Sequence, residues 1–365
     1  MSINRSKTIV ALTLALVPLM TRAAVSTNSG YTQLNLVANV ASNAMRGDPQ
    51  LLNPWGIVVG RSAIWVNDNH SSLSTTYDAL GKKLKLTVNV PAPGGGGGAP
   101  TGLAQNDSAQ FVINGSKAAP AAFLMATENG TIAAWNVFSG SNAVIVVDHS
   151  ASNAIYKGIA LARDATGAPH IYAANFHSQR VEEFDGQFNP VRSFTDPDVP
   201  DDFAPFNIRA IRGRLFVTYA KKDNPDAGDD EPGAGNGFID IFDTDGTLLR
   251  RFAEHGALNS PWGLAVAPKN FGKFSHALLV GNFGDGTINA YDLLTGKWLG
   301  QLTTPAGNPV VIEGLWALSF EKDEILDHES EFIAQRLYFT AGPNEEADGL
   351  LGILRPVSPA FPPAR

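Results

Sequence analysis

The chain contains no cysteine, and this absence excludes several kinds of chemistry at once. A disulfide framework, a thiolate metal site and a cysteine nucleophile all need that residue. Charged residues make up only 17% of the 365 residues, and the net charge is −8. Because no basic stripe accompanies this acidity, nucleic acid is not expected as a partner.

Common catalytic signatures are missing as well. The sequence holds no Gly-x-Ser-x-Gly elbow and no His-Glu-x-x-His, which removes the usual hydrolase and zinc-protease motifs. The glycine run at 94–98 lies between prolines, so it cannot begin the helix that a dinucleotide fingerprint requires. We interpret it as a loop. With no haem or dinucleotide motif, a redox enzyme is the least supported interpretation.

Long apolar runs are confined to the N-terminus. Arg5 and Lys7 precede an apolar run over 8–20, which is short for a membrane span, and small residues follow at Ala23 and Ala24. This order is typical of a secretory signal peptide, here residues 1–23. We therefore expect a secreted or periplasmic protein without a membrane span in its mature form. Residues 358–365 form a proline-rich tail.

Glycine (36 residues) and proline (23 residues) are abundant, and one short sequence motif is repeated along the chain. The clearest copies are Pro54-Trp55-Gly56 and Pro261-Trp262-Gly263, each followed by apolar residues. Weaker copies begin at Pro100, Tyr156, Pro205 and Gly314, and the six copies recur every 46 to 56 residues. A period of roughly 40–50 residues, rich in short strands and tight turns, is typical of propeller blades.

The stretch 262–302 shows one blade in full. Apolar strands are expected at 262–266 and 277–282, and Asp285-Gly286 favours a tight hairpin into an alternating strand at 287–292. Thr295-Gly296 then leads into a fourth strand at 297–302. Third strands tend to close on an aromatic residue followed by Asp or Asn, as in Tyr77-Asp78, and that polar residue is expected to start the next turn.

The sixth repeat lacks an outermost strand after Pro356, whereas residues 31–37 alternate like a strand and belong to no blade. Pairing the two ends closes the ring and removes two exposed strand edges. The prediction is therefore an all-β fold: a six-bladed β-propeller of four-stranded blades over residues 24–357, closed by its N-terminal strand and monomeric.

The blade pattern resembles the NHL repeat, in which a Pro-x-Gly strand precedes an Ile-Tyr-Val-Ala-Asp/Asn strand and a Val-x-x-Phe-Asp strand. Three phrases resemble, more narrowly, an uncharacterised group of secreted bacterial propeller proteins, some of which carry a PEP-CTERM sorting tail. These phrases are Leu52-Asn53-Pro54-Trp55-Gly56, Thr218-Tyr219-Ala220-Lys221 and Gly235-Asn236-Gly237-Phe238-Ile239-Asp240. The resemblance spans residues 31–357 and implies a propeller, but no activity. The chain ends in Pro363-Ala364-Arg365 with no apolar helix before it, so sorting by such a tail is not implied.

Polar side chains recur where the second strand of each blade ends. Asn67, Asn175 and Asn282 are expected at equivalent places, where they would point into the mouth of the central channel, a concave place suited to ligands. Turn formation predicts the same residue types, so both interpretations stay open. The candidate ligand-binding residues are Asn67, Asp68, Glu128, Asn175, His177, Asn207, Lys221, Asn282, Asp285 and Glu313. No catalytic residue is assigned.

Clustered carboxylates at the mouth favour a cation, and Ca²⁺ is the one cofactor considered. The acidic stretch 223–231 partly matches the spacing of calcium loops, but Pro225 and Pro232 interrupt it, and a solvated excursion is the alternative.

The expected function is an exported binding or scaffold module that holds a small molecule, a glycan or a protein at the mouth. The alternative is a divalent-metal-dependent, lactonase-like hydrolase that uses the oxygen-rich channel. The fold alone does not decide whether the protein is an enzyme.

Overall fold

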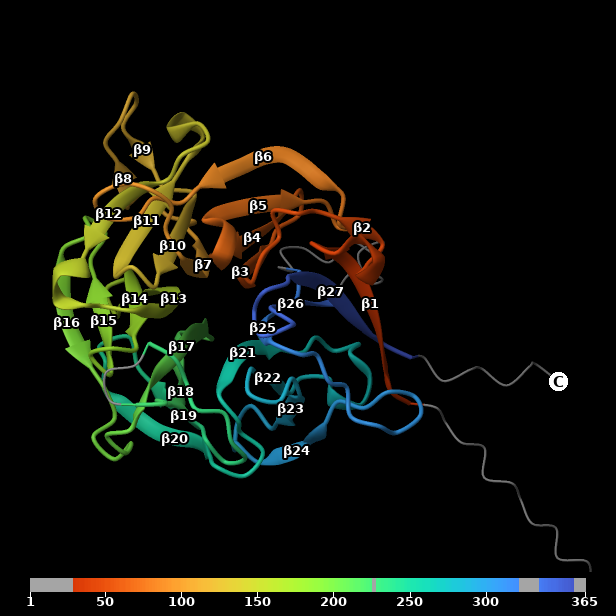
Figure 1. Ribbon diagram of the computed structural model, residues 1–365. Helices are drawn as coiled ribbons and strands as arrows, with labels where there is room; N and C mark the ends of the chain where they lie inside the picture. Colours follow the sequence, from red (N-terminus) through yellow and green to blue (C-terminus); the bar gives the residue numbers. More distant parts are fainter. Residues whose placement is uncertain (1–28, 225–227, 322–334, 358–365) are drawn as a thin grey trace, which may run out of the picture.

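Six small antiparallel sheets form a closed ring in the computed structural model, which describes residues 29–224, 228–321 and 335–357 (Figure 1). The predicted all-β, six-bladed propeller is therefore confirmed. The expected signal peptide at 1–23 and the tail at 358–365 lie outside the described residues.

Each blade begins at the channel with its innermost strand and ends at the rim. Blades one and two contain β3 (Pro54–Val59), β4 (Ile64–Asp68), β5 (Leu73–Tyr77) and β6 (Lys83–Asn89), then β7 (Pro100–Gln105), β10 (Phe123–Thr127), β11 (Thr131–Trp135) and β12 (Val144–Asp148). Blades three and four contain β13 (Tyr156–Arg163), β14 (Pro169–Asn175), β15 (Arg180–Phe184) and β16 (Pro190–Phe194), then β17 (Phe203–Ile211), β18 (Arg214–Lys221), β19 (Phe238–Phe242) and β20 (Leu248–Glu254). Blade five contains β21 (Pro261–Val266), β22 (Leu278–Asn282), β23 (Ile288–Tyr291) and β24 (Trp298–Gln301).

The sixth blade is assembled from both ends of the chain. Its strands β25 (Leu315–Ser319), β26 (Leu337–Ala341) and β27 (Leu350–Pro356) are completed by β1 (Tyr31–Ala38), which pairs antiparallel with β27 from Tyr31 opposite Pro356 to Ala38 opposite Leu350. A two-residue strand, β2 (Arg46–Gly47), extends the sheet beyond β1. The predicted closure is thus confirmed, one residue longer than expected.

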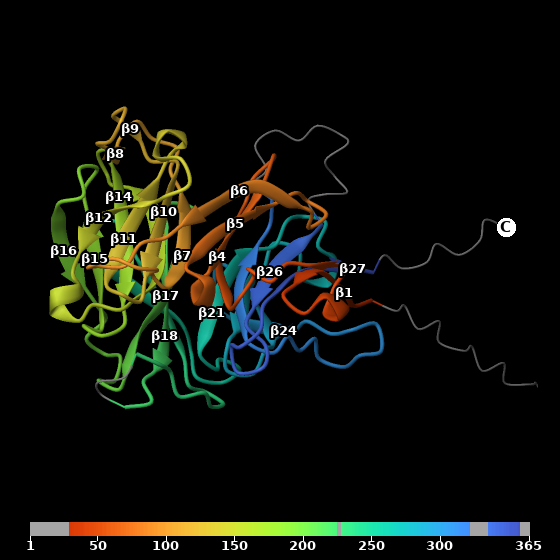
Figure 2. The ribbon, with the colours of Figure 1, turned by 45° about the horizontal axis from the view of Figure 1, so that its top comes forward.

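Short elements occupy the connections. A hairpin of β8 (Val112–Ile113) and β9 (Ala119–Pro120) projects from the rim of blade two (Figure 2). The remaining elements are the 3-10 helices η1 (Ala41–Asn43), η2 (Asn69–Ser71), η3 (Val137–Ser139), η4 (Ser150–Ser152) and η5 (Gly272–Phe274).

The repeated glycine has a steric cause. A Cβ atom on Gly56 would lie 2.5 Å from the carbonyl oxygen of Thr101, and one on Gly102 would lie 2.6 Å from the amide nitrogen of Ile159. Each of these contacts belongs to the innermost strand of the next blade. Glycine therefore recurs at this position in four blades, at Gly56, Gly102, Gly158 and Gly263, because the backbones of neighbouring innermost strands approach closely there.

The acids after the third strands form the turns predicted for them. One carboxylate oxygen of Asp78 accepts the amides of Leu80 and Lys82, at 2.8 and 2.9 Å. Asp185 and Asp243 make the same pair of bonds two and four residues ahead. These carboxylates stabilise the outer turns of the blades.

Candidate binding site at the channel mouth

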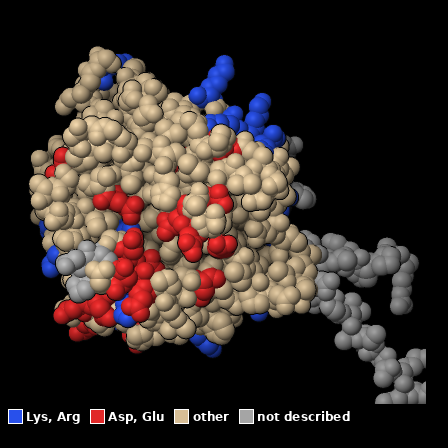
Figure 3. All heavy atoms as spheres, viewed as in Figure 1, with Lys and Arg blue, Asp and Glu red and all other residues tan. Residues whose placement is uncertain are grey.

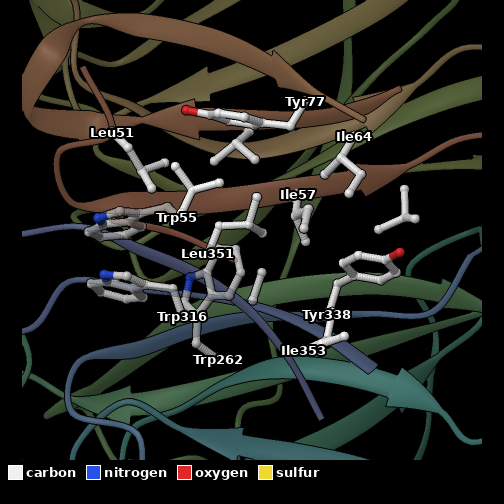
Figure 4. Close-up of a cluster of buried hydrophobic side chains, with 14 of the residues drawn as sticks. Leu51, Trp55, Ile57, Ile64, Tyr77, Trp262, Trp316, Tyr338, Leu351 and Ile353 are labelled. Atoms are coloured by element: carbon white, nitrogen blue, oxygen red, sulfur yellow. The ribbon is translucent and has the colours of Figure 1, made fainter. Parts of the chain in front are cut away.

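Aromatic side chains fill the central channel at one level. In every blade this level is occupied by the first residue of the irregularity in the pairing between the innermost and second strands. We call the set the plug: Trp55, Thr101, Lys157, Phe206, Trp262 and Trp316. The rings of Trp55 and Trp316 stack at 3.5 Å, and Trp262 meets both edge-on (Figure 4). All six side chains are buried, so the plug blocks the channel here.

An ion pair rests on the plug. The Nζ of Lys157 lies 2.5 Å from a carboxylate oxygen of Glu128 and 5.0 Å from the centre of the Trp55 ring. The other Glu128 oxygen accepts a hydrogen bond from Asn69 at 2.9 Å. Burial by itself raises the pKa of Glu128, but the Lys157 ammonium and the Asn69 hydrogen bond, with a smaller contribution from His70, hold the pKa below its usual value. The pair therefore stays ionised although Lys157 is only 2% exposed.

A second carboxyl is held over the plug by strained backbone. Asn344, Glu345 and Glu346 have consecutive φ angles of 58°, 52° and 65°, a left-handed conformation that costs roughly 1–2 kcal/mol for each non-glycine residue. This turn brings Glu346 Oε2 to 2.5 Å from Nδ2 of Asn53, whose Oδ1 in turn accepts the Trp316 indole N–H at 2.9 Å. Burial raises the pKa of Glu346 to about 7.

The acidic excursion of blade four completes this side of the mouth. Asp229 lies 3.7 Å from Lys157 Nζ, and burial raises the pKa of Asp230 to about 6. Figure 3 shows the resulting concentration of Asp and Glu around the centre of this face. Residues 225–227 of the candidate calcium loop lie outside the described residues.

Five of the expected ligand residues retain some exposed surface. Glu128 lies at the centre of the mouth. Lys221 pairs with Glu231 at 2.7 Å, and Glu313 accepts the amide of Asn344 at 2.9 Å. Asp285 is exposed at the hairpin of blade five, and His177 is half-buried in the loop after β14.

The other five are buried and bonded within the protein. Asn67 donates to the carbonyls of Thr101 and Gly102 in the next blade, and Asn207 donates to that of Trp262 at 2.7 Å. Asn175 and Asn282 bond mainly to their own loops or to the loop leading into their blade, and Asp68 accepts from Thr75 at 2.7 Å. These side chains hold loops and blades together.

The expected equivalence of the three asparagines is wrong by one residue for Asn67. Strand pairing puts Asp68 opposite Pro54, as Asn175 lies opposite Tyr156 and Asn282 opposite Pro261. Because successive residues of a strand face opposite sides, a shift of one position sends Asn67 towards blade two.

Sequence reasoning missed Glu346 altogether. It lies between the second and third strands of blade six, the same connection from which Asp285 was taken in blade five. The repeat could therefore have identified the loop. Nothing in the sequence pattern predicted the left-handed turn that carries Glu346.

Two kinds of feature are absent from the described ranges. Among residues 29–224, 228–321 and 335–357, no group of three or more His, Asp or Glu side chains is arranged to hold a metal ion. No helix within these ranges is long and apolar enough to cross a membrane.

Fold and mouth together define a six-bladed propeller with a plugged channel and an acidic face. No model of a known protein family matches the chain. It is 34% identical over 327 residues to "Uncharacterized protein R648" of Acanthamoeba polyphaga mimivirus, covering 87% of this chain and 78% of that protein. It is 34% identical over 332 residues to "Uncharacterized protein L690" of the same virus, covering 87% and 84%. The chain belongs to the family of these uncharacterised proteins.

Solved structures show the fold alone. A Bacteroides thetaiotaomicron protein of unknown function matches with a TM-score of 0.53 and 11% identity, over 90% of this chain and 76% of its own. Virginiamycin B lyase of Staphylococcus aureus matches with a TM-score of 0.49 and 12% identity, over 90% and 99%. The expected resemblance thus holds for the propeller, whereas the sequence relatives named above are viral and not bacterial.

Proposed function

We propose that the protein is an exported, monomeric binding module whose channel mouth holds a positively charged group of a small molecule, glycan or protein. The observation that carries this proposal is the strained turn at 344–346, which holds the Glu346 carboxyl against Asn53 over the plug. Left-handed turns of non-glycine residues persist where the surrounding structure demands them, often at binding sites.

The charge of the mouth supports a cationic ligand. The raised pKa values of Glu346 and Asp230, about 7 and about 6, show that burial destabilises their charged forms. An added cation would relieve this cost, because an opposite charge nearby favours the ionised carboxyl. Glu128 is already paired with Lys157, so an added cation would stabilise the ionised form of Glu346 more than that of Glu128.

The plug limits how the ligand sits. Its indoles are too deeply buried for a ligand to stack on them. Phe283, however, stacks on Trp316 at 4.0 Å and remains half-buried, so it offers an apolar contact beside the carboxyls. The ligand would therefore rest on top of the plug, with its cationic group towards Glu346.

The decisive experiment is a titration of the protein with the polyamine spermine at several pH values. Affinity should rise as the pH passes from about 5 to about 8, since Glu346 and Asp230 ionise in that interval. Glu346→Gln should weaken binding about tenfold at pH 8, the loss expected for one charge-assisted hydrogen bond.

Glu345→Gln is the matched control, because Glu345 is exposed on the same turn and its replacement removes the same charge. Spermine binding that is absent, or equally affected by both substitutions, would refute the proposal. Stoichiometric, spermine-competitive Ca²⁺ binding would instead favour the metal-dependent hydrolase.

Export is a separate part of the proposal and rests on the N-terminal sequence. N-terminal sequencing of the protein recovered outside the cytoplasm should show cleavage near Ala23. Recovery of only full-length protein in the cytoplasm would argue against it.

A further inference from the structure

On the other side of the plug, the channel holds a cavity of about 190 Å³ lined by all six innermost strands. Aliphatic side chains, among them Ile57, Leu103, Ile159, Leu264 and Leu318, line it together with backbone groups and the polar side chains of Gln105, Asn207 and Ser319. Trp262 of the plug forms part of its lining, so the plug stands between this cavity and the acidic mouth.

Arg209 is the only charged residue among those described in the cavity wall. It extends from β17 in blade four, and its Nη1 donates to the carbonyl oxygen of Leu318 in blade six at 3.2 Å. A guanidinium carries five N–H groups. No ion pair to Arg209 is formed among the described residues, and its side chain is half-buried, with its remaining surface on the cavity.

Arg209 is partly withdrawn from water and has no counter-ion among the described residues. Desolvation lowers the pKa of Arg209, and no neighbouring carboxylate opposes the shift. Buried charges in proteins are ordinarily paired, because taking an ion out of water is costly. An anion that entered the cavity would supply the missing counter-charge.

We propose that this cavity binds a small organic carboxylate, whose anionic head pairs with Arg209 while its apolar body lies against the aliphatic wall. The guanidinium fork matches a carboxylate by two parallel N–H···O bonds. Inorganic phosphate would satisfy the charge but leave the apolar wall unfilled, so the organic acid is favoured. This site is independent of the acidic mouth, which lies beyond the plug.

The test is a calorimetric titration of the protein with hexanoate, 1-hexanol, hexylammonium and inorganic phosphate, each up to about 10 mM. Hexanoate should bind at one site per chain. Hexanol, which lacks the charge, and phosphate, which lacks the apolar body, should each bind at least about tenfold more weakly. Hexylammonium should not bind in this cavity.

Arg209→Met keeps an unbranched apolar stem and removes the guanidinium with its charge, and it should weaken hexanoate binding about tenfold or more without affecting hexanol. Arg214→Met is the matched control, since Arg214 is an exposed arginine of the adjacent strand β18. If Arg209→Met does not fold, Arg209→Lys keeps the charge but not the fork, and a partial loss of affinity is then expected. Absent hexanoate binding, or equal affinity in wild type and Arg209→Met, would overturn the proposal.

Discussion

Lys157, Glu128 and Glu346 show how single charges behave over the plug. Lys157 occupies a position where three other blades place tryptophan, so its ammonium lies deep in the protein and depends on Glu128. No cation among the described residues is in direct contact with Glu346, and its pKa is raised. The two carboxyls therefore differ: Glu128 is paired and stays ionised, whereas Glu346 titrates near neutral pH.

The raised pKa of Glu346 predicts a pH-dependent cost in stability. In the unfolded chain a glutamate ionises near 4.3, and in the folded protein Glu346 ionises near 7. Between these values the folded state binds more protons, so this group's contribution to the free energy of unfolding falls as pH rises. Relative to wild type, the free energy of unfolding of Glu346→Gln should therefore rise by about 2 kcal/mol between pH 4.5 and pH 8.

Denaturant unfolding of both proteins across this pH interval checks the prediction. Glu345→Gln, on the exposed neighbour, should run parallel to wild type. A Glu346→Gln curve that also runs parallel would mean that the Glu346 carboxyl titrates in the folded protein as it does in water.

At the scale of elements, β1 reaches its blade from the opposite end of the chain. It covers β27 along its length, and the Tyr31 hydroxyl donates to the carbonyl of Phe271 in blade five at 2.9 Å. Without β1, an edge of blade six would expose unpaired backbone groups.

A chain beginning at Ala41 should therefore aggregate or melt far below a chain beginning at Ser29, which retains β1. Thermal unfolding combined with size-exclusion chromatography distinguishes the two. A monomeric Ala41 chain with an unchanged melting temperature would show that β1 contributes little to closure.

For the whole molecule, the plug joins blades that are distant in sequence. Trp55, Phe206, Trp262 and Trp316 come from blades one, four, five and six and meet on the axis. The ring is thereby stabilised from its centre as well as by contacts between neighbouring blades, such as the stacking of Trp65 on Phe123 at 4.1 Å.

Trp316→Ala should lower the free energy of unfolding by about 3–5 kcal/mol, because it empties the centre of the plug and leaves Asn53 without its indole donor. Trp298, 51% exposed on the outermost strand of blade five, is the control. Its indole also donates a hydrogen bond, to Asn289, so its replacement by Ala should cost about 1–2 kcal/mol. Equal losses in the two variants, measured by denaturant unfolding, would contradict a central role for the plug.

The sequence by itself determined the blades, their number and the closure of the ring. It could do so because strand alternation, turn residues and the repeated glycine are local requirements, met separately in each repeat. Gly56 and Gly102 recur for steric contact with the next blade, and Asp78 and Asp185 recur for turns a few residues long. Such local constraints can be recognised in the amino-acid sequence of each repeat.

Only the tertiary structure decided which polar residues face the mouth. Asn67 and Asp68 differ by one position, and strand register alone sends the first towards the next blade. The left-handed turn that carries Glu346 to Asn53 joins residues 293 positions apart, and Arg209 crosses the channel between blades four and six. The burial, pairing and pKa of these side chains depend on residues contributed by other blades. The sequence of a single repeat does not contain that information.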